Sequence, residues 1–226
     1  MTVVVTGASS GIGKATALEL HARGAALVLS GRNEQRLSEV AQQAGNSRNI
    51  RGDVSSPEIC SKLFATIPEG PLAAVFAAGN AEFGPTLDFT REQWQASIDA
   101  NLTGLFNCCQ AAIKAMLPRG GGKIVAVLSI AAKYAFPQSA AYVASKTGAL
   151  GLIHSLQSEF RAQGIALTAF MPGSTDTELW DRQGWSPDRS DMISPQDVAR
   201  AIADIVLTDS SGVFDEVVFM PKKGIL

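Results

Sequence analysis

Tyr142 and Lys146 are the residues whose types and spacing most clearly indicate chemistry. They lie four residues apart, and Tyr142 follows Ser129 by thirteen residues. On a helix, a spacing of four places two side chains on one face. A cation beside a phenol favours the ionised form and lowers the phenol pKa. Such a tyrosine exchanges a proton near neutral pH, and Ser129 would then bind the oxygen that gains or loses this proton.

A glycine-rich turn near the N-terminus predicts a binding site for a dinucleotide. The sequence TGASSGIG at residues 6–13 joins an apolar run to a helical pattern. Its glycines permit a tight turn and allow backbone amides to approach a pyrophosphate at the helix N-terminus. Glycine turns also occur for packing reasons, but the position after the first predicted strand favours the binding site. The predicted contacts are Gly7, Ser9, Ser10, Gly11, Ile12 and Gly13.

Arg32 follows the second predicted strand, within the sequence SGRN at residues 30–33. NAD sites place an acidic residue at this point to bind the ribose 2′-hydroxyl, and residues 30–33 contain none. A guanidinium group instead matches a 2′-phosphate through its planar array of donors. We therefore predict NADP(H) in preference to NAD(H). The alternative is a solvent-facing arginine at the start of a helix.

Short β-branched runs alternate with longer helical patterns along the chain, and these are the elements that must position the reactive residues. The pattern predicts an α/β fold with a doubly wound, mostly parallel sheet and helices on both faces. Such a sheet binds ligands at the carboxyl ends of its strands. The predicted strands are 3–6, 25–30, 49–52, 72–77, 123–128, 165–171 and 213–220. The predicted helices are 11–23, 33–44, 90–116 and 140–162, with further helices starting at Ser56 and Ser194.

The sequence is similar to the short-chain dehydrogenase/reductase family across nearly its full length. The glycine motif of the family matches residues 6–13, and its adenine-contacting pair matches Asp53 and Val54. The resemblance implies a single Rossmann-like domain over residues 1–226. It also implies a short substrate lid at about 174–193.

Two further motifs support the resemblance. The Asn-Asn-Ala-Gly motif of the family matches only in part, as FAAG at residues 76–79. Both asparagines are absent, whereas Ala78 and Gly79 still offer backbone beside a cofactor. The loop that covers the nicotinamide in the family resembles the stretch with Pro172, Gly173, Thr175 and Thr177.

The resemblance implies a catalytic tetrad of Asn101, Ser129, Tyr142 and Lys146. Tyr142 would act as the general acid or base, and Ser129 would bind the substrate oxygen. Lys146 would lower the phenol pKa and hold the nicotinamide ribose. Asn101 would anchor a water that leads from Lys146 to solvent.

The substrate pocket is less defined by the sequence than the catalytic residues are. Trp180 and Trp185 lie in the expected lid, where they either line an apolar pocket or pack the lid against the body of the domain. Phe136 and Gln138, just before the predicted catalytic helix, are further candidates for the pocket wall.

Composition excludes several classes of protein. The chain has 226 residues, 46% hydrophobic and 18% charged, which is typical of one globular domain. The net charge of −2 gives no electrostatic reason to expect nucleic acid. No signal-peptide pattern or long apolar run is present, so we expect a cytoplasmic protein without a membrane span. Cys60, Cys108 and Cys109 suit neither a disulfide framework nor a zinc site, so we expect free thiols and no metal.

The sequence therefore predicts an NADP-dependent enzyme that reduces a ketone, aldehyde or 3-oxoacyl group, or that catalyses the reverse reaction. The habit of the family implies a homodimer or homotetramer. The alternative is a dinucleotide-binding sensor or structural protein without turnover. The presence of all four tetrad residue types argues against this alternative, because a sensor needs no proton donor. His21 and His154 have no nucleophile or metal ligand beside them in the pattern, so we expect surface or packing roles for both.

Overall fold

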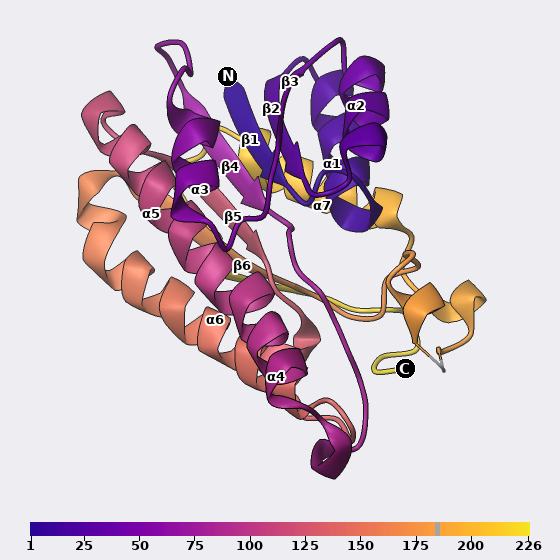
Figure 1. The fold of residues 1–226 in the computed structure, drawn as a ribbon. Coiled ribbons are helices and arrows are strands. Elements are labelled where there is room, and N and C mark those ends of the chain that lie inside the picture. The colour runs from indigo at the N-terminus through magenta and orange to yellow at the C-terminus, as the bar shows by residue number, and fades with distance from the viewer. Residues whose placement is uncertain (184–185) are drawn as a thin grey trace.

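A parallel sheet of seven strands forms the centre of the molecule, in the order β3-β2-β1-β4-β5-β6-β7 (Figure 1). The computed structural model describes residues 1–183 and 186–226. Every pairing in the sheet is parallel, which confirms the predicted doubly wound, Rossmann-like architecture. The strands are β1 (Thr2–Thr6), β2 (Ala26–Gly31), β3 (Arg48–Arg51), β4 (Leu72–Phe76), β5 (Gly122–Val127), β6 (Ile165–Pro172) and β7 (Glu216–Phe219).

Helices cover both faces of the sheet (Figure 1). One layer contains α3 (Pro57–Phe64), α5 (Gly104–Met116) and α6 (Ala140–Phe160). The other layer contains α1 (Gly11–Ala22), α2 (Glu34–Gln43) and α7 (Pro195–Leu207). The short helix α4 (Arg91–Ile98) leads into α5 through a π-helical turn at Asp99–Thr103. Among the described residues, none of the helices combines the length and the apolar character needed to cross a bilayer.

The strands alternate their side chains between two separate cores. Val4, Ala74 and Ile124 pack against the layer of α3, α5 and α6. Val3 and Val5 belong to the core beneath α1, α2 and α7. Strands that are buried on both faces read as continuous apolar runs, and this explains why the strand positions were visible in the sequence.

Side chains cap several of the helices as their sequences suggest. The Asn33 carboxamide oxygen accepts from the Arg36 amide (3.0 Å) at the start of α2. Thr90 and Gln93 form both hydrogen bonds of the expected capping box. Ser56 occupies the cap of α3, but its hydroxyl donates to Glu58 (2.6 Å) instead of accepting from the helix.

Two predicted elements were partly wrong. The helix expected at 90–116 is divided by the π-helical turn, which contains no glycine or proline itself and is followed by Gly104. The last strand begins at Glu216 rather than at residue 213, because Val213 and Phe214 are exposed and lie outside the sheet. Other predicted strand boundaries differ from the observed ones by one or two residues. The three cysteines are buried free thiols, as predicted.

Candidate active site

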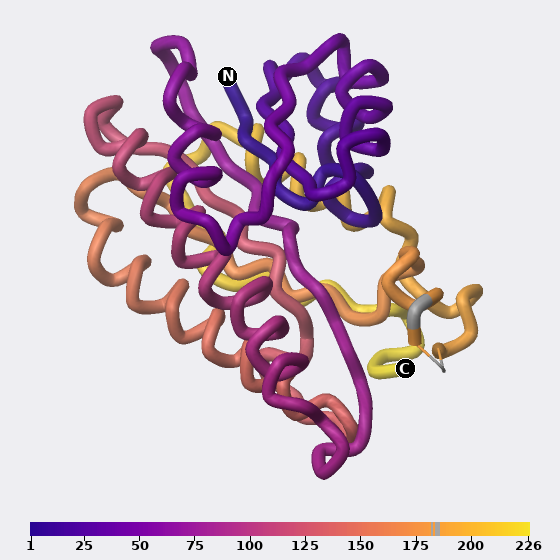
Figure 2. The backbone as a smooth tube through the Cα atoms, viewed as in Figure 1, coloured from indigo at the N-terminus to yellow at the C-terminus, as the bar shows by residue number. Residues whose placement is uncertain are grey.

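A cleft with a volume of about 1260 Å³ opens at the carboxyl ends of the strands. Its walls come from the segments that follow β1 to β6, from the start of α6 and from the C-terminal residues 225 and 226. Figure 2 shows the C-terminal residues beside the segment 174–193, to which Lys223 is tied by an ion pair with Asp191 (2.8 Å). The position of the cleft agrees with the rule for ligand sites in open α/β sheets.

The turn between β1 and α1 is packed too closely to accept side chains at its glycines. Gly7 has a φ of +69°, and a β-carbon there would lie 2.6 Å from the Ala77 carbonyl oxygen. A β-carbon at Gly13 would lie 2.3 Å from the Gly7 carbonyl oxygen. The first turn of α1 carries no acidic residue, so the positive end of the helix dipole faces the cleft without a counter-charge on its own helix. These features fit a bound pyrophosphate.

The end of β2 presents arginine rather than carboxylate to the cleft. Arg32 lines the cleft, and its guanidinium lies 3.7 Å from the Asp53 carboxylate. One turn further along the chain, Arg36 of α2 forms an ion pair with Glu178, which crosses from the segment after β6. All four side chains are substantially exposed. Arg36 and Glu178 both line the cleft, although neither was predicted from the sequence to belong to the site.

Val54 forms the adjoining wall and is held from behind. Its carbonyl oxygen accepts from the Asn107 side chain (3.2 Å) and from the Cys60 thiol (3.3 Å). The Asn107 side chain also donates to the carbonyl oxygen of Ser55 (2.9 Å). These bonds from α3 and α5 fix the backbone of this part of the cleft wall.

Tyr142 and Lys146 project from one face of α6 into the cleft. The Lys146 ammonium nitrogen lies 5.7 Å from the centroid of the Tyr142 ring and donates to the Val127 carbonyl oxygen (3.4 Å). Ser129 follows β5 by two residues and lines the same cleft, where its hydroxyl acts to lower the pKa of the Tyr142 phenol. The hydroxyl oxygen of Ser129 also accepts from the Ala131 amide (3.1 Å). The side chains of Tyr142 and Lys146 from α6 and of Ser129 from the segment after β5 therefore line the same part of the cleft.

The net shift of the Tyr142 pKa is upward, opposite to the lowering expected from a neighbouring lysine. Burial raises the pKa of Tyr142 above its ordinary value, and the hydrogen bond from Ser129 offsets only part of that rise. Burial also lowers the pKa of Lys146 from 10.5 to about 8. Desolvation, which the sequence did not reveal, dominates both groups. The phenol therefore keeps its proton at neutral pH, as a proton donor must.

Asn101 lies behind the cleft rather than in its wall. It is 2% exposed and belongs to the π-helical turn. Its carboxamide nitrogen donates to the carbonyl oxygen of Asn80 (3.0 Å) and to the Ser145 hydroxyl (3.1 Å), and its oxygen accepts from the Asn80 amide (3.1 Å). A β-carbon at Gly79 would lie 2.7 Å from the Asn101 oxygen and 3.6 Å from the Lys146 nitrogen. Asn101 therefore braces the chain after β4 against the helix that carries the reactive pair.

The segment after β6 folds back over the glycine-rich turn. The Gly173 amide donates to the Phe219 carbonyl oxygen (2.9 Å), which ties this segment to β7. Thr177 lies against Gly11, where a β-carbon would be 3.3 Å from the threonine methyl carbon. Thr175 forms an isolated parallel bridge with Ile193. The segment is thus a loop whose two ends are held together.

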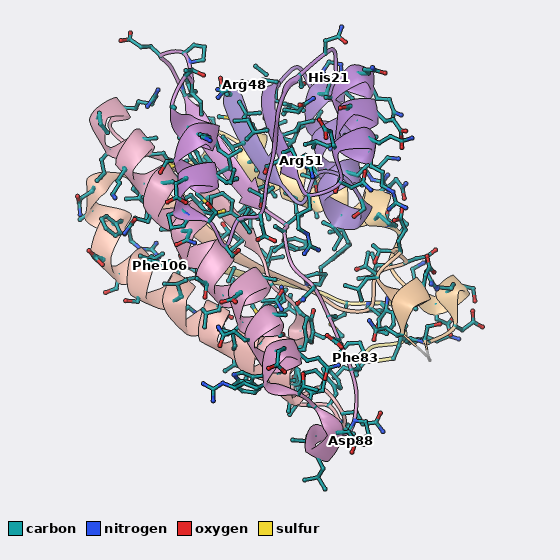
Figure 3. All side chains as sticks on the ribbon, in the orientation of Figure 1. His21, Arg48, Arg51, Phe83, Asp88 and Phe106 are labelled. Atoms are coloured by element: carbon teal, nitrogen blue, oxygen red, sulfur yellow. The ribbon has the colours of Figure 1, made fainter. Side chains whose placement is uncertain are left out.

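Aromatic side chains line the opposite end of the cleft. Phe83 packs edge-on against Tyr142 with 5.6 Å between ring centroids, and its centroid lies 6.1 Å from that of Trp180. Figure 3 labels Phe83 on the stretch that leads from β4 to α4, facing the segment 174–193. Phe136 and Gln138 also line the cleft. Trp185 lies outside the described residues.

The structure gathers nearly all of the predicted site residues around one cleft. Asn101 is the exception, since it supports the wall from behind. Phe83 was missed because it lies in a long irregular stretch without periodicity, whereas Arg36 was visible one helical turn beyond the Asn33 cap. His21 lies against Gly45 and His154 against Glu216, and neither lines the cleft. Within the part of the chain that the structure describes, no group of histidine, cysteine and acidic residues could hold a metal ion. The predicted cofactor-binding residues in the wall are Gly7, Ser9, Ser10, Gly11, Ile12, Gly13, Arg32, Asp53, Val54, Ala78, Gly79, Pro172, Gly173, Thr175 and Thr177.

Comparison with known proteins identifies the family. The family model described as short chain dehydrogenase matches residues 1–186. The chain belongs to the short-chain dehydrogenase family. A relative from Mediterraneibacter gnavus, 3beta-hydroxysteroid dehydrogenase, is 39% identical over 188 residues, which cover 80% of this chain and 68% of the relative.

Solved structures of other short-chain dehydrogenases have the same fold. A short-chain dehydrogenase/reductase from Vibrio parahaemolyticus is 28% identical with a TM-score of 0.86, and the match covers 97% of this chain and 100% of that one. The actinorhodin polyketide ketoreductase, solved with NADPH, is 27% identical with a TM-score of 0.85, over 97% of this chain and 94% of that one. This short-chain dehydrogenase is accordingly an oxidoreductase of a family that uses nicotinamide dinucleotides and acts on small molecules. The glycine turn, the uncompensated end of α1 and the arginine after β2 fit such a cofactor.

Proposed function

We propose that the enzyme reduces a ketone, an aldehyde or a 3-oxoacyl group with NADPH, and oxidises the corresponding alcohol in reverse. The observation that carries this proposal is that Tyr142, Ser129 and Lys146 line one cleft, with the Tyr142 pKa above its ordinary value, so that the phenol holds its proton. A proton donor that is partly shielded from water, near a hydroxyl donor, is what a carbonyl oxygen needs as it gains negative charge.

Each of the three side chains has a distinct task in the reduction. Ser129 donates a hydrogen bond to the carbonyl oxygen and so orients the substrate. Tyr142 transfers its phenolic proton to that oxygen. The Lys146 ammonium stabilises the phenolate that is left behind, because an opposite charge nearby favours the ionised form. The bound dinucleotide supplies the hydride that the carbonyl carbon receives.

The residues proposed to hold the cofactor come from four stretches of the chain, each facing a different part of the dinucleotide. The glycine turn and the start of α1 bind the pyrophosphate through backbone amides, and Asp53 and Val54 border the adenine. Ala78 and Gly79 line the ribose side. The stretch 172–177 covers the nicotinamide and begins the substrate lid at 174–193.

Arg32 supports NADP(H) over NAD(H) as the cofactor. A 2′-phosphate would replace Asp53 as the partner of this exposed guanidinium, and charge-assisted, bidentate hydrogen bonds favour that exchange. The solved ketoreductase relative carries NADPH, and the named activity of the 3beta-hydroxysteroid dehydrogenase relative concerns a hydroxyl group. Both similarities support a reaction that interconverts an alcohol and a ketone.

We further propose a cytoplasmic homodimer or homotetramer with contacts through α4, α5 and α6. Trp94 of α4 and Phe106 of α5 are 42% and 45% exposed, respectively, so both are available for a contact between subunits. Light scattering of the purified enzyme tests this assembly, and a monomer at micromolar concentration contradicts it.

An assay of NADPH consumption against a panel of ketones, aldehydes and 3-oxoacyl esters tests the activity. We expect turnover that depends on substrate, with a higher kcat/KM for NADPH than for NADH. A clear preference for NADH contradicts the assignment of the cofactor. Tight cofactor binding without turnover across the panel favours the alternative of a sensor or structural protein.

A further inference from the structure

The two ends of the cleft differ in charge. The charged side chains of the wall, apart from Lys146, are the two ion pairs Arg32–Asp53 and Arg36–Glu178 at the adenosine end. Beyond Tyr142, no charged side chain lines the cleft among those that the structure describes. The apolar side chains of that end are Phe83, Phe136, Leu179, Trp180, Met220 and Ile225, and the neutral side chains of Gln138 and Gln183 also line it.

Phe83 and Trp180 form an aromatic wall directly beside the proposed proton donor. The Phe83 ring stands almost perpendicular to the Tyr142 ring, at an interplanar angle of 87°. Toward the other side it meets the Trp180 ring at 34°. The two rings come from segments almost one hundred residues apart, so the wall exists only when both segments are in place.

Hydrogen bonds fix both rings at this position. The Trp180 indole nitrogen donates to the Thr175 carbonyl oxygen (3.1 Å) within its own segment. The Gln183 side chain reaches across to the Ala81 carbonyl oxygen (2.8 Å), two residues before Phe83. The Gly84 amide, one residue after Phe83, donates to the Gln138 carbonyl oxygen (2.8 Å). The wall is therefore tied to the lid on one side and to the approach to α6 on the other.

We propose that the enzyme selects uncharged ketones in which a ring adjoins the carbonyl group, with Phe83 and Trp180 as the specificity-determining residues. This inference rests on the proposed carbonyl reduction. A ring packed between aromatic side chains gains dispersion and area burial, with preferred offset or edge contacts. A carboxylate or phosphate in the same place loses its hydration without gaining a counter-charge. In each turnover the carbonyl carbon gains the hydride, its oxygen gains the Tyr142 proton, and NADPH becomes NADP⁺.

The test compares an uncharged ring ketone with two other ketones, one that adds a charge and one that lacks the ring. Methyl 4-acetylbenzoate carries a ring and no charge, 4-acetylbenzoate carries the same ring with a carboxylate, and 2-butanone has neither. We expect kcat/KM for the methyl ester to exceed that for each of the other two by about tenfold or more, the range that pocket contacts supply. Equal kcat/KM for the charged and uncharged ring ketones overturns the inference.

Substitutions in the wall give a second readout. Phe83→Ala and Trp180→Ala are expected to lower the ratio of kcat/KM for the methyl ester to that for 2-butanone by about tenfold, mainly through KM. Leu87→Ala is the matched control, because Leu87 lies on the same stretch as Phe83, is 99% exposed and does not line the cleft. Phe83→Tyr keeps the ring and is expected to retain the ratio.

The outcomes separate this inference from the function on which it rests. Reduction of all three ketones with an unchanged ratio in both alanine variants overturns the aromatic wall as a selector and leaves the carbonyl reductase intact. NADPH binding by calorimetry without turnover of any of the three overturns the inference, and it overturns the carbonyl reductase as well if the aldehydes and 3-oxoacyl esters of the wider panel are also not reduced. If Trp180→Ala does not fold, Phe83→Ala alone decides, since Phe83 lies in an irregular stretch outside both cores.

Discussion

The adenosine end and the substrate end of the cleft are built in different ways. The adenosine end consists of short turns that directly follow β1, β2 and β3, with glycines where backbone contacts backbone. The substrate end forms where two long segments, 77–90 and 174–193, meet in the folded chain, and the second segment also extends Glu178 to the adenosine end. The first kind of site follows from local sequence, and the second follows from tertiary contacts. This difference explains why the cofactor class is easier to infer than the substrate.

The largest expected effect removes the proton donor between the two ends. Tyr142→Phe keeps the ring but deletes the hydroxyl, so kcat is expected to fall by a factor on the order of 10² or more. Cofactor affinity, measured by calorimetry, should change little because the adenosine end is untouched. Near wild-type turnover in this variant would remove Tyr142 from its proposed role.

Burial of Lys146 provides a prediction about stability and pH. Depression of its pKa from 10.5 to about 8 corresponds to a destabilisation of up to about 3 kcal/mol at neutral pH. Between these two values the unfolded chain still binds the proton that the folded chain has released, so this contribution to stability rises with pH. Lys146→Met should therefore unfold at higher denaturant concentration than the wild type at pH 7.

The difference in the free energy of unfolding between Lys146→Met and the wild type should shrink from pH 8 toward pH 10.5. Denaturant unfolding of both proteins across this window, without added cofactor, measures the change. A difference in the free energy of unfolding that stays constant with pH would show that Lys146 has an ordinary pKa.

Arg32 tests the adenosine end by itself. Arg32→Ala is expected to weaken NADPH binding by about tenfold to a hundredfold, because hydrogen bonds to charged groups contribute about 1.5–3 kcal/mol. NADH binding should change far less. Arg51→Ala is the matched control, since Arg51 is an exposed arginine on β3 that pairs with Glu34 and does not line the cleft. Equal losses for both cofactors would refute a contact with the 2′-phosphate.

The smallest expected effect concerns the ion pair that spans the adenosine end. Arg36 and Glu178 are both about half-exposed, and exposed pairs contribute roughly 0–1 kcal/mol. The pair joins the segment after β6 to α2 across the adenosine end, so its loss should make it easier for that segment to open. Glu178→Gln should therefore speed NADPH release by about twofold to fivefold, measured by stopped-flow fluorescence. The effect should vanish at high salt, because screening weakens exposed pairs. An acceleration that persists in high salt points to altered packing of Thr177 instead.

Much of the fold was predictable because its five inner strands, β2, β1, β4, β5 and β6, are mostly buried on both faces. Val3, Val28 and Val75 stand in apolar runs, and these runs appear as strands within one or two residues of their predicted bounds. The last strand was predicted too long because Val213 and Phe214 are apolar but exposed. The π-helical turn was missed because apolar periodicity continues from α4 into α5 across it.

The site was predictable where local spacing determines geometry. Tyr142 and Lys146 share a helix face, so their spacing alone brings them together. The pKa of each depends on burial by distant segments, and the sequence carries no direct signal of burial. Phe83 and Glu178 were missed for a related reason, since their partners lie far away in the chain.

The stem of the segment 174–193 has a consequence for how new specificities arise. The Ile193 amide donates to the Ser174 carbonyl oxygen (3.0 Å), and the Asp176 amide donates back to the Ile193 carbonyl oxygen (2.9 Å). Residues can therefore be inserted or deleted beyond this stem without shifting β6 or α7. Because these hydrogen bonds close the loop at its base, we expect that the loop can be replaced by others of different sequence. Libraries of such loops would change substrate specificity while Tyr142, Ser129 and Lys146 keep their positions.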